Sequence, residues 1–269
     1  MMSMVTNFLY PPPPSLLITA MYVINFSLLA NSALSEIRGK YLQYSKFWNT
    51  NTSQKEKTKE VKLSSRAGML ILYTPAFLAS AVSLYLLAED GLRLLLVTAA
   101  LTIHYFKRVL EVMFVHKYSG AMILDSTILI SLSYFSSTAS MIYNQHLVHD
   151  MPEPPVDLKY AGVFIFLVAI VGNFYHHLLL LKLRSKDEGV KEYKIPKGGL
   201  FNQVICPHYF FEILVFVGIC LISQSLYPIC FTIGTMMYLM SRSYTTRKWY
   251  VSKFPSFPKD VKAIIPYVF

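Results

Sequence analysis

Residues 158–181 have the sequence LKYAGVFIFLVAIVGNFYHHLLLL, in which Lys159 is the only side chain that is charged at neutral pH. A helix that crosses the hydrocarbon core of a bilayer needs about 20 mostly apolar residues. This stretch therefore predicts a membrane-spanning helix. Its polar residues Asn173, His176 and His177 are costly inside a bilayer, and such residues usually face a cavity or a partner.

Six further apolar stretches predict helices of similar kind, at roughly 15–34, 68–88, 92–115, 121–143, 209–226 and 228–242. The last two are short and closely joined, so they can also form one helical hairpin. The chain is 54% hydrophobic and 15% charged, whereas a soluble domain carries about 25% charged residues. We therefore predict an all-α integral membrane protein with about seven transmembrane helices. Disordered, collagen-like and disulfide-rich classes are excluded by the same composition.

The basic residues account for a net charge of +10 and are distributed unevenly along the chain. With seven spans, 23 of the 25 Lys and Arg residues lie on one side, and only Arg93 and Lys159 lie on the other. The positive-inside rule predicts a cytosolic C-terminus and an N-terminus in a lumen or outside the cell. We expect an uncleaved first span, because no basic segment precedes it and a basic loop follows it.

The third stretch carries His104, Arg108 and Glu111 at positions i, i+4 and i+7, which lie on one helical face. Arg108 and Glu111 can pair with each other, or this face can contact a ligand. In the fifth stretch Asn173, His177 and Arg184 lie within about 40° of one another. Hydrogen bonding between helices can explain this pattern, but the charge of Arg184 favours a stripe that faces a ligand.

Nucleotide and metal motifs are absent from the sequence. No GxGxxG, GxxxxGK[ST] or GxSxG string occurs, which excludes the corresponding nucleotide and hydrolase sites. We predict no metal, since the adjacent His176 and His177 point apart on a helix without a carboxylate at ligand spacing. Phosphates of a bound nucleotide would have to contact basic side chains of the cytosolic loops. The same side chains can instead bind anionic lipid headgroups.

Three strings near the C-terminus are more specific: YKIPKGGLF at 193–201, CPHYFFEI at 206–213, and RSYTTRKWYVSKFPSFPKDVKAIIPYVF at 242–269. Together they resemble the C-terminal region of the steroid 5α-reductase family. The resemblance extends over roughly residues 66–269 and is strongest after Asn173. It implies a reductase domain at 66–269, preceded at 1–65 by one span and a basic cytosolic loop. It further implies an endoplasmic reticulum membrane enzyme that uses NADPH, with its helices around a central cavity for cofactor and substrate.

The resemblance also implies roles for individual residues. Tyr105, in the string HYFKR, matches the tyrosine that donates to the substrate carbonyl. Tyr73 stands where the family has a glutamate and is a second donor candidate, while Thr246 replaces a family histidine. The residues expected to bind the cofactor are Arg108, Asn173, His177, Arg184, Tyr193, His208, Glu212, Arg242 and Tyr250.

The activity implied is NADPH-dependent reduction of a carbonyl-conjugated C=C bond in a lipid, foremost a 3-oxo-Δ4-steroid. Because Tyr73 and Thr246 depart from the family pattern, trans-2-enoyl-CoA reduction, polyprenol reduction and a non-catalytic sterol-binding role stay open. The expected partners are a lipid substrate and the membrane, with no nucleic acid. The sequence names no partner in a lipid-synthesis complex and assigns no role to Asp125.

Overall fold

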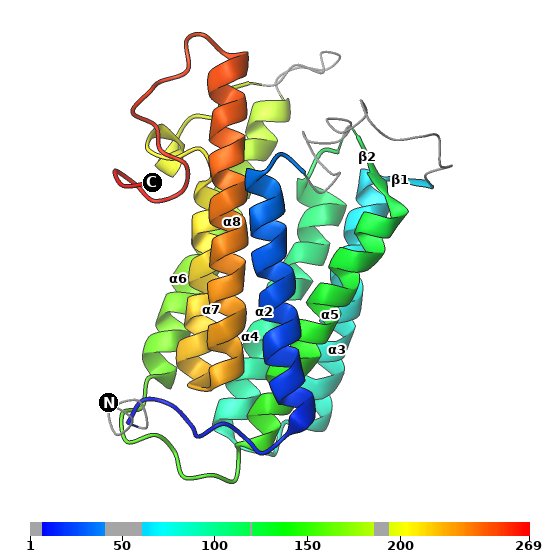
Figure 1. The fold of residues 1–269 in the computed structure, drawn as a ribbon, viewed down its shortest axis with the longest axis vertical. Helices are drawn as coiled ribbons and strands as arrows, with labels where there is room; N and C mark the ends of the chain where they lie inside the picture. Colours follow the sequence, from blue (N-terminus) through cyan, green and yellow to red (C-terminus); the bar gives the residue numbers. More distant parts are fainter. Residues whose placement is uncertain (1–6, 41–60, 119, 186–193) are drawn as a thin grey trace.

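A computed structural model of the chain describes residues 7–40, 61–118, 120–185 and 194–269, without the side chains of residues 184 and 185. Its described part forms an up-and-down bundle of long helices that run alternately in opposite directions (Figure 1). These helices are α2 (Leu16–Ile37), α3 (Ser65–Leu86), α4 (Leu92–Leu110), α5 (Leu124–Leu147), α6 (Lys159–Ser185), α7 (Pro207–Ser223) and α8 (Leu226–Lys253).

Each of the seven predicted stretches contains a helix, and the largest difference concerns the end of the last one. Hydropathy falls after residue 242, yet α8 continues to Lys253. Polar side chains where the extension begins are buried and paired with α2. Arg242, at the end of the predicted stretch, pairs with Glu36, and the hydroxyl of Thr245 donates to the Glu36 carbonyl oxygen. Burial of paired polar groups lets the helix extend beyond its apolar portion.

Three pieces of short structure were not predicted. Strands β1 (Lys62–Ser64) and β2 (Ala121–Ile123) pair antiparallel, with Leu63 opposite Met122. A π-helical turn, η2 (Glu111–Val115), follows α4, and a 3₁₀ turn, η3 (Gly199–Asn202), precedes α7. Segments of three to five residues are too short to produce a periodic pattern in the sequence.

Close approach of backbones determines how α6 packs on α7. A Cβ atom on Gly162 would lie 2.6 Å from the Ile222 nitrogen, and one on Gly218 would lie 2.8 Å from the Phe166 nitrogen. Only residues without a side chain permit this contact, which is typical of helix packing in membranes. Elsewhere in the bundle α2 packs along α8, and α3 packs on both α4 and α5.

Among the described helices, α2, α3 and residues Lys159–Leu183 of α6 are long and apolar enough to cross a membrane, and α7 is a shorter apolar helix. The other three are more polar, and part of that polarity is buried inside the bundle, as at Asn144 and Gln145 of α5. These features are those of an all-α membrane protein.

The two ends of the bundle differ in character. At one end, called here the strand end, lie β1, β2, η3 and the C-terminal tail (Figure 1). Most of the basic residues that the structure describes belong to these segments and to the helix ends beside them. The opposite end, called here the turn end, contains the connections 87–91, 148–158 and 224–225, together with Arg93 and Lys159. Asp125, which had no assigned role, is exposed in the first turn of α5. A carboxylate at this position interacts favourably with the helix dipole.

Candidate active site

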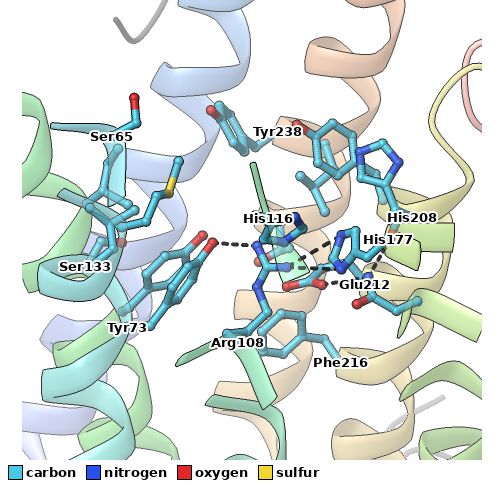
Figure 2. Close-up of a pocket in the computed structure, with 18 of the residues that line it drawn as sticks. Ser65, Tyr73, Arg108, His116, Ser133, His177, His208, Glu212, Phe216 and Tyr238 are labelled. Carbon is cyan, nitrogen blue, oxygen red and sulfur yellow. Dashed lines mark hydrogen bonds between the residues drawn. The ribbon is translucent and has the colours of Figure 1, made fainter. Parts of the chain in front are cut away.

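A cavity of about 550 Å³ lies among the helices toward the strand end. One part of its wall is apolar and comes from α2, α3, α5 and α8, including Leu28, Leu72, Ile130 and Phe231. The facing part is polar and comes mainly from α4, α6 and α7, with its side chains turned toward one another (Figure 2). The members of this polar wall are Arg108, Asn173, His177, His208 and Glu212.

Arg108 lies between the two parts of the wall, close to Tyr73 (Figure 2). Its Nη2 donates to the Tyr73 hydroxyl oxygen at 2.5 Å, and the guanidinium carbon lies 4.7 Å from the centre of the Tyr73 ring. Its Nη1 donates to Oε2 of Glu111 at 3.0 Å, so the predicted Arg108–Glu111 pair is confirmed. Arg108 therefore pairs with Glu111 and lines the cavity at once.

Glu111 is 1% exposed and belongs to the π-helical turn that follows α4. Its Oε1 lies 2.8 Å from Lys107 Nζ and 2.9 Å from His177 Nδ1. A π turn shifts the phase of a helix and is frequent at functional sites. Here it brings the carboxylate toward α6, where it contacts His177.

Asn173 connects this group to α7. Its Nδ2 donates to Glu212 Oε2 at 3.0 Å and to the His208 carbonyl oxygen at 2.8 Å, and its Oδ1 accepts from Lys107. His104 Nε2 lies 3.4 Å from Glu212 Oε1. The polar wall is thus part of one continuous network that also includes Lys107 and Glu111. The two cations of this network, Lys107 and Arg108, and its two carboxylates, Glu111 and Glu212, cancel in formal charge. Such a wall suits a neutral group that both donates and accepts hydrogen bonds better than it suits a phosphate.

His116 was missed by the sequence analysis although it lines the cavity, with its ring 4.8 Å from that of His177. It follows the π turn, so counting 100° per residue from α4 does not place it correctly. Ligand-type atoms of Glu111, His116 and His177 lie within 4.8 Å of one another. However, Lys107 and Arg108 already contact the Glu111 carboxylate, and their positive charge opposes binding of a cation there.

The two predicted carbonyl donors occupy different layers. Tyr73 lines the cavity and stacks on Tyr134 with ring centres 5.6 Å apart. Tyr105 is 1% exposed, does not line the cavity, and lies behind Tyr134 with ring centres 6.0 Å apart. Its ring also meets that of His104 edge-on.

Two predicted cofactor contacts lie elsewhere in the structure, and two lie outside its described part. The buried Arg242 donates from Nη1 to both oxygens of Glu36, at 2.7 and 2.9 Å. Tyr250 packs on Phe254 and donates from its hydroxyl to the Lys194 carbonyl oxygen at 3.4 Å. Neither lines this cavity. The side chain of Arg184 and all of Tyr193 lie outside the described residues.

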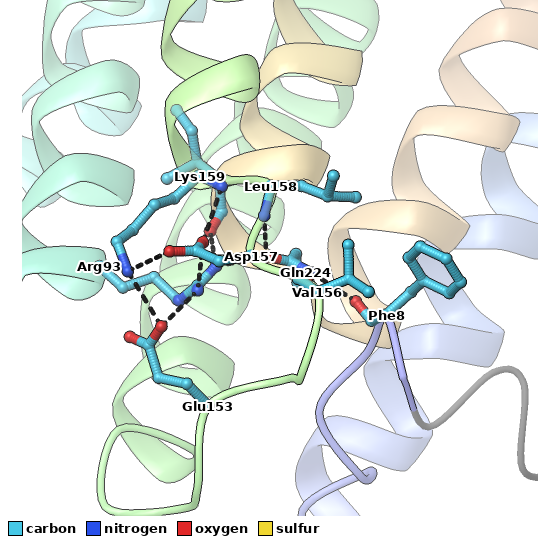
Figure 3. Close-up of polar contacts among 9 residues, drawn as sticks. Phe8, Arg93, Glu153, Val156, Asp157, Leu158, Lys159 and Gln224 are labelled. Atoms are coloured by element: carbon cyan, nitrogen blue, oxygen red, sulfur yellow. Dashed lines mark hydrogen bonds and ion pairs between the residues drawn. The ribbon is translucent and has the colours of Figure 1, made fainter.

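A second buried arginine, Arg93, lies at the turn end (Figure 3). Its Nη1 donates to the Ile222 carbonyl oxygen at 2.6 Å and to Gln224 Oε1 at 2.9 Å, and its Nη2 donates to Glu153 and Asp157 at 2.8 and 2.9 Å. The Gln224 amide in turn donates to the carbonyl oxygens of Phe8 and Val156. This group, called here the turn-end clamp, ties four separate chain segments together.

Fold and site together define a helical membrane protein that holds a buried polar network against an apolar cavity. Residues 120–269, more than half of the chain, match the family model described as 3-oxo-5-alpha-steroid 4-dehydrogenase. The chain belongs to this family, as the sequence resemblance predicted.

Curated relatives include proteins named as enoyl-CoA reductases and proteins named as steroid 5-alpha-reductases. The probable very-long-chain enoyl-CoA reductase art-1 of Caenorhabditis elegans is 31% identical over 63% of this chain and 57% of its own length. The steroid 5-alpha-reductase DET2 of Gossypium hirsutum is 40% identical over 40% of this chain and 42% of its own length. Human 3-oxo-5-alpha-steroid 4-dehydrogenase 2 is 26% identical over 77% of this chain and 82% of its own length. The chain thus spans about half the length of the first two.

Proposed function

We propose that this protein is an NADPH-dependent membrane oxidoreductase that reduces a carbonyl-conjugated C=C bond in a lipid, foremost a 3-oxo-Δ4-steroid to its 5α-reduced product. The observation that carries the proposal is the contact of Arg108 with the cavity-lining Tyr73, at the boundary between the polar and apolar walls. A lipid substrate needs an apolar wall, whereas its carbonyl oxygen needs a hydrogen-bond donor.

The polar wall is a suitable place for the nicotinamide end of the cofactor. A carboxamide both donates and accepts hydrogen bonds, and the wall offers the matching donors of Arg108 and His208 and the carboxylate of Glu212. Its balanced charge argues that the phosphates are bound elsewhere, by basic side chains of the strand end such as the predicted Arg184. When bound, NADPH would supply a hydride to the β-carbon of the substrate.

The protein's own contribution is then the stabilisation of charge on the substrate. Hydride addition to the β-carbon moves negative charge onto the carbonyl oxygen, and a phenol held in the wall donates to that oxygen. Arg108, which donates to the Tyr73 oxygen, stabilises negative charge as Tyr73 shares its proton. A proton from water or a tyrosine then completes the reduction at the α-carbon. Tyr105 acts on the site indirectly: it lies in the layer behind the cavity wall, and its ring contacts Tyr134 and His104.

Reduction of a trans-2-enoyl-CoA is the second candidate. The enoyl-CoA reductase-like relative from Caenorhabditis elegans aligns with 63% of this chain, against 40% for the plant steroid reductase. In addition, Tyr73 replaces the carboxyl group that the steroid-reducing members are expected to use. An enoyl thioester presents the same conjugated carbonyl to the same donor, so the chemistry is shared and only the rest of the substrate differs.

We place the enzyme in the endoplasmic reticulum membrane, with all seven helices crossing, the turn end in the lumen and the strand end in the cytosol. The asymmetry of the basic residues supports this orientation. Cytosolic NADPH would then reach the cavity from the strand end, toward which the cavity lies.

The test is to follow NADPH oxidation in microsomes that contain the protein, with a 3-oxo-Δ4-steroid, a trans-2-enoyl-CoA and a polyprenol-derived carbonyl as substrates. Oxidation with the steroid supports the main proposal, and oxidation with the thioester alone supports the second. No oxidation with any of the three would favour a non-catalytic sterol-binding role. An Arg184→Ala variant should raise the apparent KM for NADPH, and an unchanged value would contradict that cofactor assignment.

A further inference from the structure

His176, next to the cavity-lining His177, faces away from the cavity and contacts the loop before α7. It is 3% exposed, and its ring lies between that of Phe211, 5.2 Å away between centres, and that of Phe201, 5.6 Å away. It is not among the side chains that line the cavity. The network described above does not use it.

Both ring nitrogens of His176 have a partner that permits only one role. Nδ1 lies 2.7 Å from the carbonyl oxygen of Gly172, which can only accept a hydrogen bond. Nε2 lies 3.1 Å from the backbone nitrogen of Leu200, which can only donate one. The imidazole must therefore be neutral, with its proton on Nδ1. In this state it ties the 3₁₀ turn η3 to helix α6.

The chain around Leu200 is shaped to meet the imidazole. Gly198 and Gly199 both have positive φ angles, of 90° and 51°. A Cβ atom on Gly199 would lie 2.9 Å from His176 Nε2, so only glycine allows both this backbone conformation and this approach. The glycine pair of the string IPKGGLF thus has a specific structural partner.

The tethered loop leads directly into the polar wall. After η3, residues 203–206 are held by the C-terminal tail, as in the bond from Ile205 N to the Lys262 carbonyl oxygen at 2.9 Å. Helix α7 begins at Pro207, and its His208 and Glu212 line the cavity. Asn173, one turn before His176 on α6, holds the His208 carbonyl oxygen. Helix α6 therefore fixes this connection at two points.

We propose that His176 is a positioning residue: by tying Leu200 to α6 through its neutral imidazole, it sets the position of His208 and Glu212 on the cofactor side of the cavity. The link to cofactor binding rests on the function proposed above. The tether itself does not depend on that function and can be measured separately.

The test compares His176→Gln with His176→Asn in the full-length protein in lipid nanodiscs. A glutamine amide reaches the position of Nε2 and can accept from Leu200 N–H, whereas an asparagine amide reaches only the position of Nδ1. In hydrogen exchange, we expect the amides of residues 198–206 to exchange about tenfold faster in the Asn variant, with little change in the Gln variant. The control is a His149→Asn variant at the exposed turn end. In this variant the amides of residues 198–206 should exchange at the wild-type rate.

The kinetic readout separates positioning from general stability. We expect His176→Asn to raise the KM for NADPH about tenfold while kcat changes less than about threefold, and His176→Gln to restore the wild-type KM. Equal exchange rates of residues 198–206 in the wild type, His176→Asn and His176→Gln would overturn the tether. The positioning role would be overturned if the KM for NADPH rose equally in the Asn and Gln variants. It would also be overturned if exchange became faster while that KM stayed unchanged. If the wild type oxidises no NADPH, the proposed function fails while exchange still decides the tether.

Nitrogen-15 NMR of histidine-labelled wild type gives a check that needs no substitution. The Nδ1–H tautomer is expected for His176, with the signal assigned by its loss in the Gln variant. An Nε2–H tautomer or a charged ring would contradict the inferred hydrogen bonds.

Discussion

Two arginines of one helix have different surroundings at opposite ends of the bundle. Arg93 and Arg108 both belong to α4 and are separated by about four helical turns. Arg93 donates to carbonyl and carboxylate oxygens of the chain connections at the turn end. Arg108 donates to Glu111 and to Tyr73, and it lines the cavity. The two arginines therefore differ in their partners. Arg93 holds chain connections together, whereas Arg108 contacts a phenol on the cavity wall that we propose takes part in the reaction.

Unpaired atoms do not distinguish the two arginines. The Nε atom of each is buried without a hydrogen-bond partner among the described residues. What separates them is the arrangement of the neighbouring acids. Glu153 is about half exposed beside Arg93, whereas Glu111 beside Arg108 is 1% exposed and shared with Lys107 and His177. Substitutions at the two ends should therefore affect different measurements.

The largest effect is expected at the tyrosine that Arg108 contacts. Tyr73→Phe should lower kcat about 10²- to 10³-fold, the loss typical of one donor to a developing oxyanion, with the KM for NADPH changed less than about threefold. Tyr105→Phe should also lower turnover far more than it weakens NADPH binding, but by less than Tyr73→Phe because Tyr105 does not line the cavity. Single-turnover NADPH oxidation measures both. Wild-type turnover in Tyr73→Phe would remove this residue from the mechanism.

Arg108→Ala and Arg93→Ala test the comparison directly. Arg108→Ala should lower kcat/KM about 100-fold, since it removes the cation that supports Tyr73. Arg108→Lys keeps the charge without the forked geometry and should recover only part of the activity. Arg93→Ala should leave the kinetics of the surviving folded enzyme close to wild type. If both variants lost activity without losing stability, the proposed contrast between a functional Arg108 and a stabilising Arg93 would be wrong.

Arg93→Ala should act on stability, because it leaves the acceptors of the turn-end clamp without their cation. We expect a loss of about 2–4 kcal/mol in the free energy of unfolding, measured by thermal melting or denaturation in detergent. Gln224→Ala is a related probe, since the side chain donates to Phe8 and Val156 and accepts from Arg93. An unchanged melting temperature in both variants would show that the turn-end clamp does not stabilise the fold.

The smallest expected effect is a pH dependence at the turn end. Hydrogen bonding from Arg93, followed by that from Lys159, holds the pKa of Glu153 below its ordinary value of 4.5. A carboxyl whose pKa is lowered by folding adds stability above its unfolded pKa and loses it as the pH falls through the folded pKa. The melting temperature should therefore drop below about pH 4.5, and Glu153→Gln should reduce the slope of that drop. The same slope in Glu153→Gln would exclude Glu153 as its source.

Much of the site could be anticipated from spacing along single helices. Arg108 and Glu111 on one turn, and Asn173 and His177 on the next helix but one, were grouped correctly because helical periodicity is a local property. His116 was not found, because the π turn at Glu111–Val115 alters that periodicity. The roles of Arg184 and Tyr193 remain predictions from the family resemblance.

The apolar stretches and the distribution of charge were enough to predict seven helices, their order, and an asymmetry of basic residues between the ends. Hydropathy acts over about 20 neighbouring residues, so it can be obtained from the sequence alone. Tertiary structure alone decided that Tyr73 rather than Tyr105 lines the cavity, that Arg242 pairs with Glu36, and that His176 holds Leu200. A hydrogen bond depends on atoms within about 3 Å whose residues lie far apart in the chain, and only the packed helices bring them together.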